Sequence, residues 1–175
     1  MTRAKPENDS GRIAETMPPL HGLRTAQIVG RSFRHGIHAV QTGDSTAWAF
    51  AWQELAAAGA AGNLAQLSDG LAGFVHEVRH SAARPIEVLP RGCPGLCRDE
   101  CLAVSLVAAS QTGACPALKA CAFALLECSN LEPCLKAAAQ FGGALREAGH
   151  TLPPDMICNA LAFLPPAHGR PVAHA

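Results

Sequence analysis

Apolar residues recur at helical spacing along most of this chain, and this periodicity limits the fold more than any other feature of the sequence. Much of the hydrophobic fraction is Ala, a strong helix former, and Tyr, which strands favour, is absent. We therefore predict an all-α fold, a helical bundle of about six or seven helices, built either as one unit or as two packed sub-bundles. Three predicted helices each have a row of apolar residues along one face, which we call a seam. The seams are Ala26, Gly30, Phe33, Ile37 and Val40; Leu64, Leu67, Leu71, Phe74 and Val78; and Leu131, Cys134, Ala138, Phe141 and Leu145.

Helix-breaking residues divide the chain into five segments. Two prolines within residues 84–92 favour an extended linker between two helical halves. We expect an N-terminal segment without order at residues 1–20, a helical half at 21–83, the linker at 84–92, a cysteine-rich helical half at 93–165 and a loose tail at 166–175.

Local signals predict where individual helices begin. Pro94 and Pro116 suit the first helical turn, and Ser129 with Glu132 matches a capping box. We predict helices over residues 23–41, 46–60, 63–82, 94–110, 116–128, 130–148 and 151–164.

The net charge and the N-terminal sequence limit the partners and the cellular compartment that we expect for this protein. Fourteen basic residues balance 14 acidic ones, whereas a nucleic-acid binder usually carries a basic excess, so no nucleic-acid partner is expected. No stretch is long and apolar enough for a membrane span, and the polar first residues do not match a secretory signal. We therefore expect a cytoplasmic protein whose thiols stay reduced.

Eight cysteines, all of them after position 92, are the strongest functional signal. They are Cys93, Cys97, Cys101, Cys115, Cys121, Cys128, Cys134 and Cys158. Spacing by four would place the first three on one face of a helix, and Cys121, Cys128 and Cys134 fall on predicted apolar faces, so at least five thiols are expected to point inward. Inward thiols from adjacent helices suit a soft metal, so all eight are candidate ligands. The CxxC pairs of zinc ribbons and the ferredoxin spacings are absent, so we expect Cu(I) ahead of Zn(II) or an iron–sulfur cluster.

The run Cys93-Pro-Gly-Leu-Cys97-Arg-Asp-Glu-Cys101, followed by an Ala-rich stretch and a turn at Gly113, resembles the cysteine-rich four-helix-bundle copper storage proteins. Those proteins line a bundle core with CxxxC steps that hold Cu(I) through pairs of thiolates. The later cysteines of this chain do not repeat the step, and their density is lower. The resemblance therefore implies few bound ions, with metal delivery or metallocentre assembly in place of storage.

Two alternatives treat the cysteines differently. Free Cys packs as a small hydrophobe, so the thiols could fill an Ala-rich core in a non-catalytic protein that docks on a larger complex. In an oxidising compartment they could instead form up to four disulfides.

His76-Glu77-Val78-Arg79-His80 matches the HExxH string of zinc hydrolases, with Glu77 as general base. The helical pattern, however, turns both histidines away from the buried seam and favours a solvated face. A basic stripe of Arg24, Arg31, Arg34, His35 and His38 could meet an anionic partner, although a solvated helix face accounts for it as well.

Overall fold

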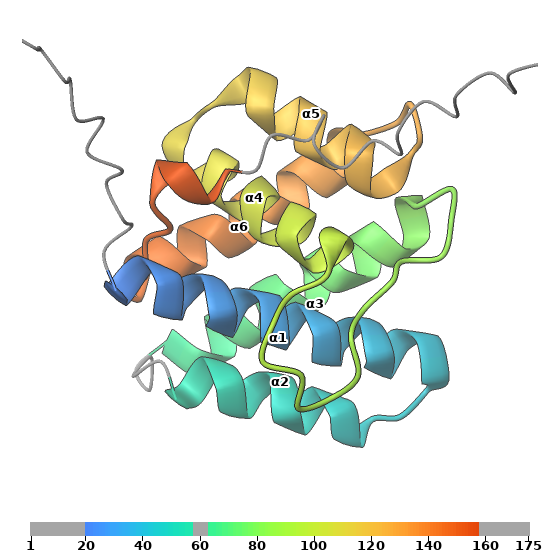
Figure 1. Cartoon of the computed structure of the whole chain (residues 1–175), viewed down its shortest axis with the longest axis vertical. Coiled ribbons are helices and arrows are strands. Elements are labelled where there is room, and N and C mark those ends of the chain that lie inside the picture. The colour runs from blue at the N-terminus through green and yellow to red at the C-terminus, as the bar shows by residue number, and fades with distance from the viewer. Residues whose placement is uncertain (1–19, 58–62, 158–175) are drawn as a thin grey trace, which may run out of the picture.

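The computed structural model describes residues 20–57 and 63–157, and within these it is all-helical (Figure 1). The helices are α1 (Leu20–Thr42), α2 (Thr46–Ala57), α3 (Leu64–Ser81), α4 (Arg98–Thr112), α5 (Cys115–Leu126) and α6 (Glu132–Glu147), followed by the short 3-10 helix η2 (Pro154–Met156). No strand occurs among the described residues, so the predicted helical bundle is confirmed.

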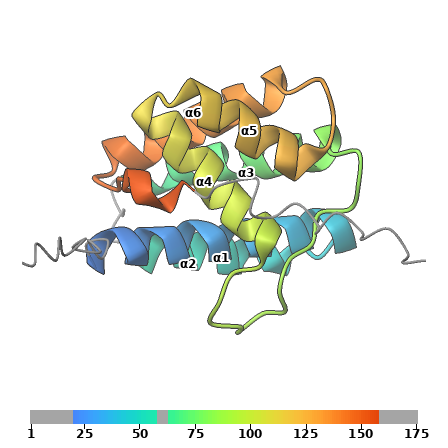
Figure 2. The same ribbon diagram turned by 45° about the horizontal axis from the view of Figure 1, so that its top comes forward.

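α4 lies at the centre of the bundle. It packs against α1 on one side and against α5 and α6 on the other, while α1 also contacts α2 and α3. Figure 2 shows α1 and α2 as one layer and α4, α5 and α6 as a second layer above it. Every residue in the stretch 102–109 of α4 is buried, because neighbouring helices cover it on all sides.

One continuous hydrophobic core joins the two halves of the chain. Phe33 of α1, Phe74 of α3 and Phe141 of α6 are fully buried, and their rings contact one another in sequence at centroid distances of 5.7 and 6.1 Å. Residues of α4 and α5 belong to the same core. The apolar seams read from the sequence therefore meet in one interior.

The first three helices follow the prediction closely, and α4 does not. Residues 94–97 stay outside the helix, which begins at Arg98 with Cys97 as the N-cap. Cys93 consequently lies in a loop, and Cys93, Cys97 and Cys101 do not share a helical face. The physical reason is that backbone groups of residues 93–97 bind Arg34 and Glu100 instead of one another.

Two further predictions of helix ends are corrected. α6 begins at Glu132 after Leu131, with no side-chain cap, so the expected Ser129 capping box is absent. The last predicted helix is only the short η2 within the described residues, and its remainder, with the residue range 158–175, lies outside them. None of the helices in residues 20–57 and 63–157 combines the length and apolarity needed to cross a membrane.

Candidate functional site: a clamped loop that carries thiols

Residues 82–97 form a long connection between α3 and α4, which we call the clamped loop. It runs across α1 and projects beyond it before turning back into α4 (Figures 1 and 2). Long loops without secondary structure are uncommon in small domains unless they serve a function. The contacts that hold this one are therefore the first place to look for a site.

Arg34 is the central residue of the clamp. Its guanidinium is 2% exposed and donates to both carboxylate oxygens of Glu100, from Nε to Oε1 at 2.7 Å and from Nη2 to Oε2 at 2.9 Å. The same guanidinium donates to the Cys93 carbonyl at 2.8 Å and to the Gly95 carbonyl at 2.6 Å. One cation thus fixes α1, α4 and the tip of the loop relative to each other.

Glu100 extends the network along the loop. Its carboxylate is fully buried and accepts hydrogen bonds from the backbone N–H groups of Leu89 at 3.0 Å and Cys97 at 2.9 Å. The bond to Cys97 also caps the N-terminus of α4, where a negative charge is favourable. Hydrogen bonding to Glu100 is the largest cause of a raised Arg34 pKa, so the guanidinium stays charged.

The neighbouring residue, Asp99, clamps the other end of the loop. Its carboxylate binds Arg84 through two hydrogen bonds of 2.7 Å and accepts the Glu87 N–H at 2.9 Å. The Arg84 guanidinium also reaches Glu127 at 3.0 Å. In α1, Gln41 donates to the Ile86 carbonyl at 2.8 Å. Backbone groups along the loop are therefore satisfied by side chains of the bundle.

Close packing adds to these polar contacts. A Cβ built on Gly30 of α1 would lie 2.6 Å from a methyl group of Leu96, so any larger residue there would force this loop side chain to shift. Buried ion pairs carry a large desolvation cost and are weak evidence for stability alone. Here the charged network and the glycine contact both fix a loop, which indicates that the loop conformation itself matters.

Three of the candidate ligands lie on or beside the clamped loop. Cys93, Cys97 and Cys101 are all half-buried. The Cys97 thiol donates to the Glu87 carbonyl at 3.2 Å, and burial, followed by the Glu100 charge, raises its pKa. Cys93 and Cys97 are close enough to Arg34 for their charges to contribute to its raised pKa. The resting site therefore holds thiols next to a fixed cation.

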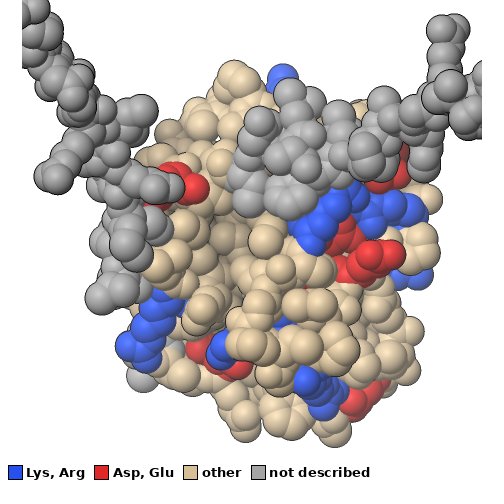
Figure 3. Space-filling view, in the orientation of Figure 1, with Lys and Arg blue, Asp and Glu red and all other residues tan. Residues whose placement is uncertain are grey.

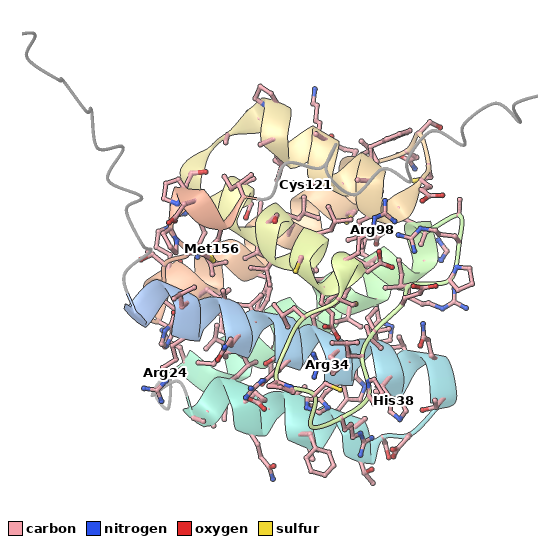
Figure 4. The ribbon with its side chains drawn as sticks, in the orientation of Figure 1. Arg24, Arg34, His38, Arg98, Cys121 and Met156 are labelled. Atoms are coloured by element: carbon pink, nitrogen blue, oxygen red, sulfur yellow. The ribbon has the colours of Figure 1, made fainter. Side chains whose placement is uncertain are left out.

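The remaining thiols are dispersed over the other half of the bundle. Cys115 is exposed at the start of α5, and Cys128 is half-buried after that helix. Cys121 and Cys134 belong to the hydrophobic core, and burial raises the pKa of Cys134 to about 12. Cys158 lies outside the described residues. Figure 4 shows Cys121 on α5, well separated from Arg34 on α1.

None of the described cysteines forms a disulfide. Within residues 20–57 and 63–157, no group of three or more His, Cys, Asp or Glu side chains is arranged to hold a metal ion. A site with three or four protein ligands is therefore not preformed there. A metal site built from only two thiols does not require a group of three or more such side chains.

Two of the HExxH residues, His76 and His80, line one open pocket on α3, but Glu77, the expected general base, is not among its lining residues. His76 and His80 are exposed on α3, and the His76 ring stacks on Trp48 at 5.9 Å. The Glu77 carboxylate instead accepts a hydrogen bond from Ser81 at 2.7 Å and lies close enough to Cys134 to influence its pKa. The hydrolase hypothesis gains no support from this arrangement.

The expected basic stripe is also incorrect in part. Arg34 and His35 are buried, at 2% and 8% exposure, and only Arg24 is exposed among the five residues. On the face shown in Figure 3, positive and negative side chains are interspersed and do not form a patch of one sign. Figure 4 places Arg34 and His38 on the side of α1 that the loop crosses.

Sequence reasoning missed Arg34, Arg84, Asp99 and Glu100 as a network. The sequence does contain one indication that Arg34 is buried. Arg34 comes four residues after Gly30 and three before Ile37, which places it at the edge of the buried face of the helix. Asp99 and Glu100 have an ordinary explanation as acidic residues in a first helical turn. Nothing local in the sequence indicates their distant partners.

Comparisons with protein-family models, with curated proteins and with solved structures found no match to this chain.

Proposed function

We propose that the protein binds a soft metal ion, Cu(I), through the thiols beside the clamped loop, and that it delivers this ion or helps to assemble a metallocentre. Cys93 and Cys97 would be the principal ligands, with Cys101 beside them. The observation that carries the proposal is the Arg34–Glu100 network, which binds the backbone at Cys93, Gly95 and Cys97. A loop fixed in this way presents its thiols in a defined arrangement.

The distribution of thiols supports this narrower choice of ligands. Cys121 and Cys134 are packed among apolar side chains, where forming a thiolate is costly. Cu(I) favours thiolates and is satisfied by as few as two of them. The proposal places the protein in a reducing cytoplasm, where the thiols stay available.

Arg34 would assist the binding electrostatically. Binding Cu(I) releases the thiol protons and leaves negative thiolates in the site. The Arg34 guanidinium, already fixed near Cys93 and Cys97, favours that negative charge. Because the pKa of Cys97 is raised in the resting protein, the affinity for Cu(I) should increase as the pH rises.

Copper loading tests the proposal. Protein purified anaerobically is mixed with Cu(I) and a competing chelator, and its native and denatured masses are compared. We expect the wild type to retain Cu(I) and the variant Cys93→Ser/Cys97→Ser to lose it. The clamp binds the backbone carbonyls of Cys93 and Gly95, so it should survive the substitution.

The matched control is Cys115→Ser/Cys128→Ser, which also removes two thiols outside the core. This variant should bind as much Cu(I) as the wild type. Equal loss of copper in both double variants, or no retained copper in the wild type, would contradict the assignment.

A second candidate is the non-catalytic interaction protein, and exposed aromatic residues favour it. Phe50 and Trp52 of α2 are 41% and 43% exposed, and Phe123 of α5 is 58% exposed. α2 has a single charged residue, Glu54, although it lies at the edge of the bundle. Apolar surface of this kind often marks contact with another protein. In this function Cys121 and Cys134 would be core packing only.

Partner capture separates the two candidates. An immobilised wild-type protein and the variant Phe50→Ser/Trp52→Ser are compared for the proteins that they retain from a cell extract. A protein held by the wild type and by Cys93→Ser/Cys97→Ser, but lost from the aromatic variant, would favour the interaction function. Identical retention by all three would count against it.

A further inference from the structure

His35 is a buried group that the proposed metal site does not use. It lies on α1, 8% exposed, and its Nδ1 is buried without a hydrogen-bond partner. Its ring contacts Phe50 of α2 at 5.7 Å between centroids. The guanidinium of Arg91, near the tip of the clamped loop, lies over the same Phe50 ring at 4.8 Å. Phe50 thus connects His35 with the loop.

The charges around His35 are unfavourable to a further proton. After burial, the largest influences on its pKa are Arg91 from the loop and Arg34, His38 and Arg31 from α1, and all of them lower it. Arg91 itself pairs with the acidic residue Asp44 at 2.9 Å. Glu54 of α2 is not among the main influences.

We propose that His35 is an acid-sensitive latch for residues 90–92 of the clamped loop, holding Arg91 on Phe50 while its ring is neutral and releasing it when the ring is protonated. A proton on the ring of His35, which is 8% exposed, adds a positive charge beside Arg34 and Arg91. Arg34 cannot move, because Glu100 and two loop carbonyls hold it. Among the described residues, the Arg91 side chain contacts Asp44 and the Phe50 ring, both of which are partly exposed, so residues 90–92 are the part that moves.

The direction of the pH effect follows from the lowered pKa of His35. The closed loop binds the His35 proton less readily than an opened loop does, so closure is fully favoured above the ordinary histidine value of 6.5. Closure begins to weaken as the pH falls below 6.5, and it continues to weaken until the pH reaches the lowered pKa that His35 has in the closed loop. Opening uncovers the part of the Phe50 ring that Arg91 covers in the closed loop, and it frees the backbone of residues 90–92.

Hydrogen exchange read by mass spectrometry tests the latch on the full-length protein without added metal. Peptides that cover residues 86–96 are compared at about pH 7.5 and about pH 5.5, after correction for the intrinsic effect of pH on exchange. We expect the protection of the loop to be lower at the acidic pH. The decrease should be at most about tenfold for each pH unit that separates the His35 pKa of the open loop from that of the closed loop. The non-titrating variant His35→Phe should lose this dependence, whereas the control His76→Phe should keep it.

A second measurement covers the case in which His35→Phe does not fold. Proton NMR of the wild type should show His35 titrating below 6.5, and Arg91→Ala should raise that midpoint. An ordinary midpoint, or loop protection that is the same at both pH values, would overturn the latch. Neither readout involves copper, so loss of the metal proposal would leave this one standing.

Discussion

At the scale of single residues, Arg34 shows how a charge can occupy the interior of a small helical protein. Its guanidinium has partners on Glu100 and on two loop carbonyls, so the burial of the charge is compensated by directional hydrogen bonds. Removing one partner of such a buried ion pair is costly, because the other charge is then buried without a partner and without solvation by water. The network is therefore sensitive to single substitutions.

Glu100→Gln is the direct test of this sensitivity. It removes the charge that faces Arg34, and we expect it to lower the free energy of unfolding by about 3–5 kcal/mol, measured by urea denaturation. The control is Glu127→Gln, which alters a carboxylate that is 49% exposed in its pair with Arg84. That change should cost no more than about 1 kcal/mol. Similar losses in both variants would contradict the importance of the buried pair.

The buried thiol of Cys134 should make the free energy of unfolding depend on pH in the alkaline range. Burial raises its pKa from 9.0 to about 12, so the folded protein holds the thiol proton that the unfolded chain releases. The stabilisation is complete below the unfolded pKa and is lost as the pH rises towards 12. Between about pH 8 and about pH 10, the urea midpoint of the wild type should fall more than that of Cys134→Ala. Equal decreases would show that Cys134 does not contribute.

At the scale of elements, the connection between α3 and α4 behaves as a part of the bundle. Side chains of α1 and α4 bind its backbone, and Leu96 packs against Gly30. Its conformation therefore depends on how closely α1 can approach it.

Gly30→Ala tests this close approach. The added Cβ would meet Leu96 at 2.6 Å, and we expect a loss of about 1–3 kcal/mol with faster hydrogen exchange in residues 86–96. Gly73→Ala is the matched control, because a Cβ on this exposed position of α3 meets no atom within 4 Å. There the better helix propensity of Ala should stabilise the protein by about 0.5–1 kcal/mol. Equal loop exchange in both variants would contradict the packing argument.

The elements also show which features can be read from sequence. The seams at Phe33 and Phe74 identify α1 and α3, because helical periodicity is a local property. The start of α4 was misplaced, since it depends on Arg34, more than sixty positions away from Glu100. The expectation that Cys93, Cys97 and Cys101 share one helical face is wrong for the same reason, because the position of Cys93 depends on a distant guanidinium.

At the scale of the whole molecule, α4 unites the two halves of the sequence. It is buried along residues 102–109, and it contacts α1, α5 and α6. The core that it completes includes residues of both halves. A protein of this construction should unfold as one cooperative unit.

Two probes from different halves test that cooperativity. Fluorescence of Trp48 and Trp52 reports on the N-terminal half, and alkylation of the buried Cys121 and Cys134 reports on the C-terminal half. We expect both signals to change at one urea concentration. Separate midpoints would show that the halves unfold independently.

The central burial of α4 also has a consequence for synthesis. The ribosome completes α1, α2 and α3 before α4 exists, so the nascent chain carries an apolar surface that its own next helix must cover. α6, which packs along α3, arrives later still. The N-terminal half is therefore expected to remain incompletely folded, and open to chaperones, until α6 has left the exit tunnel.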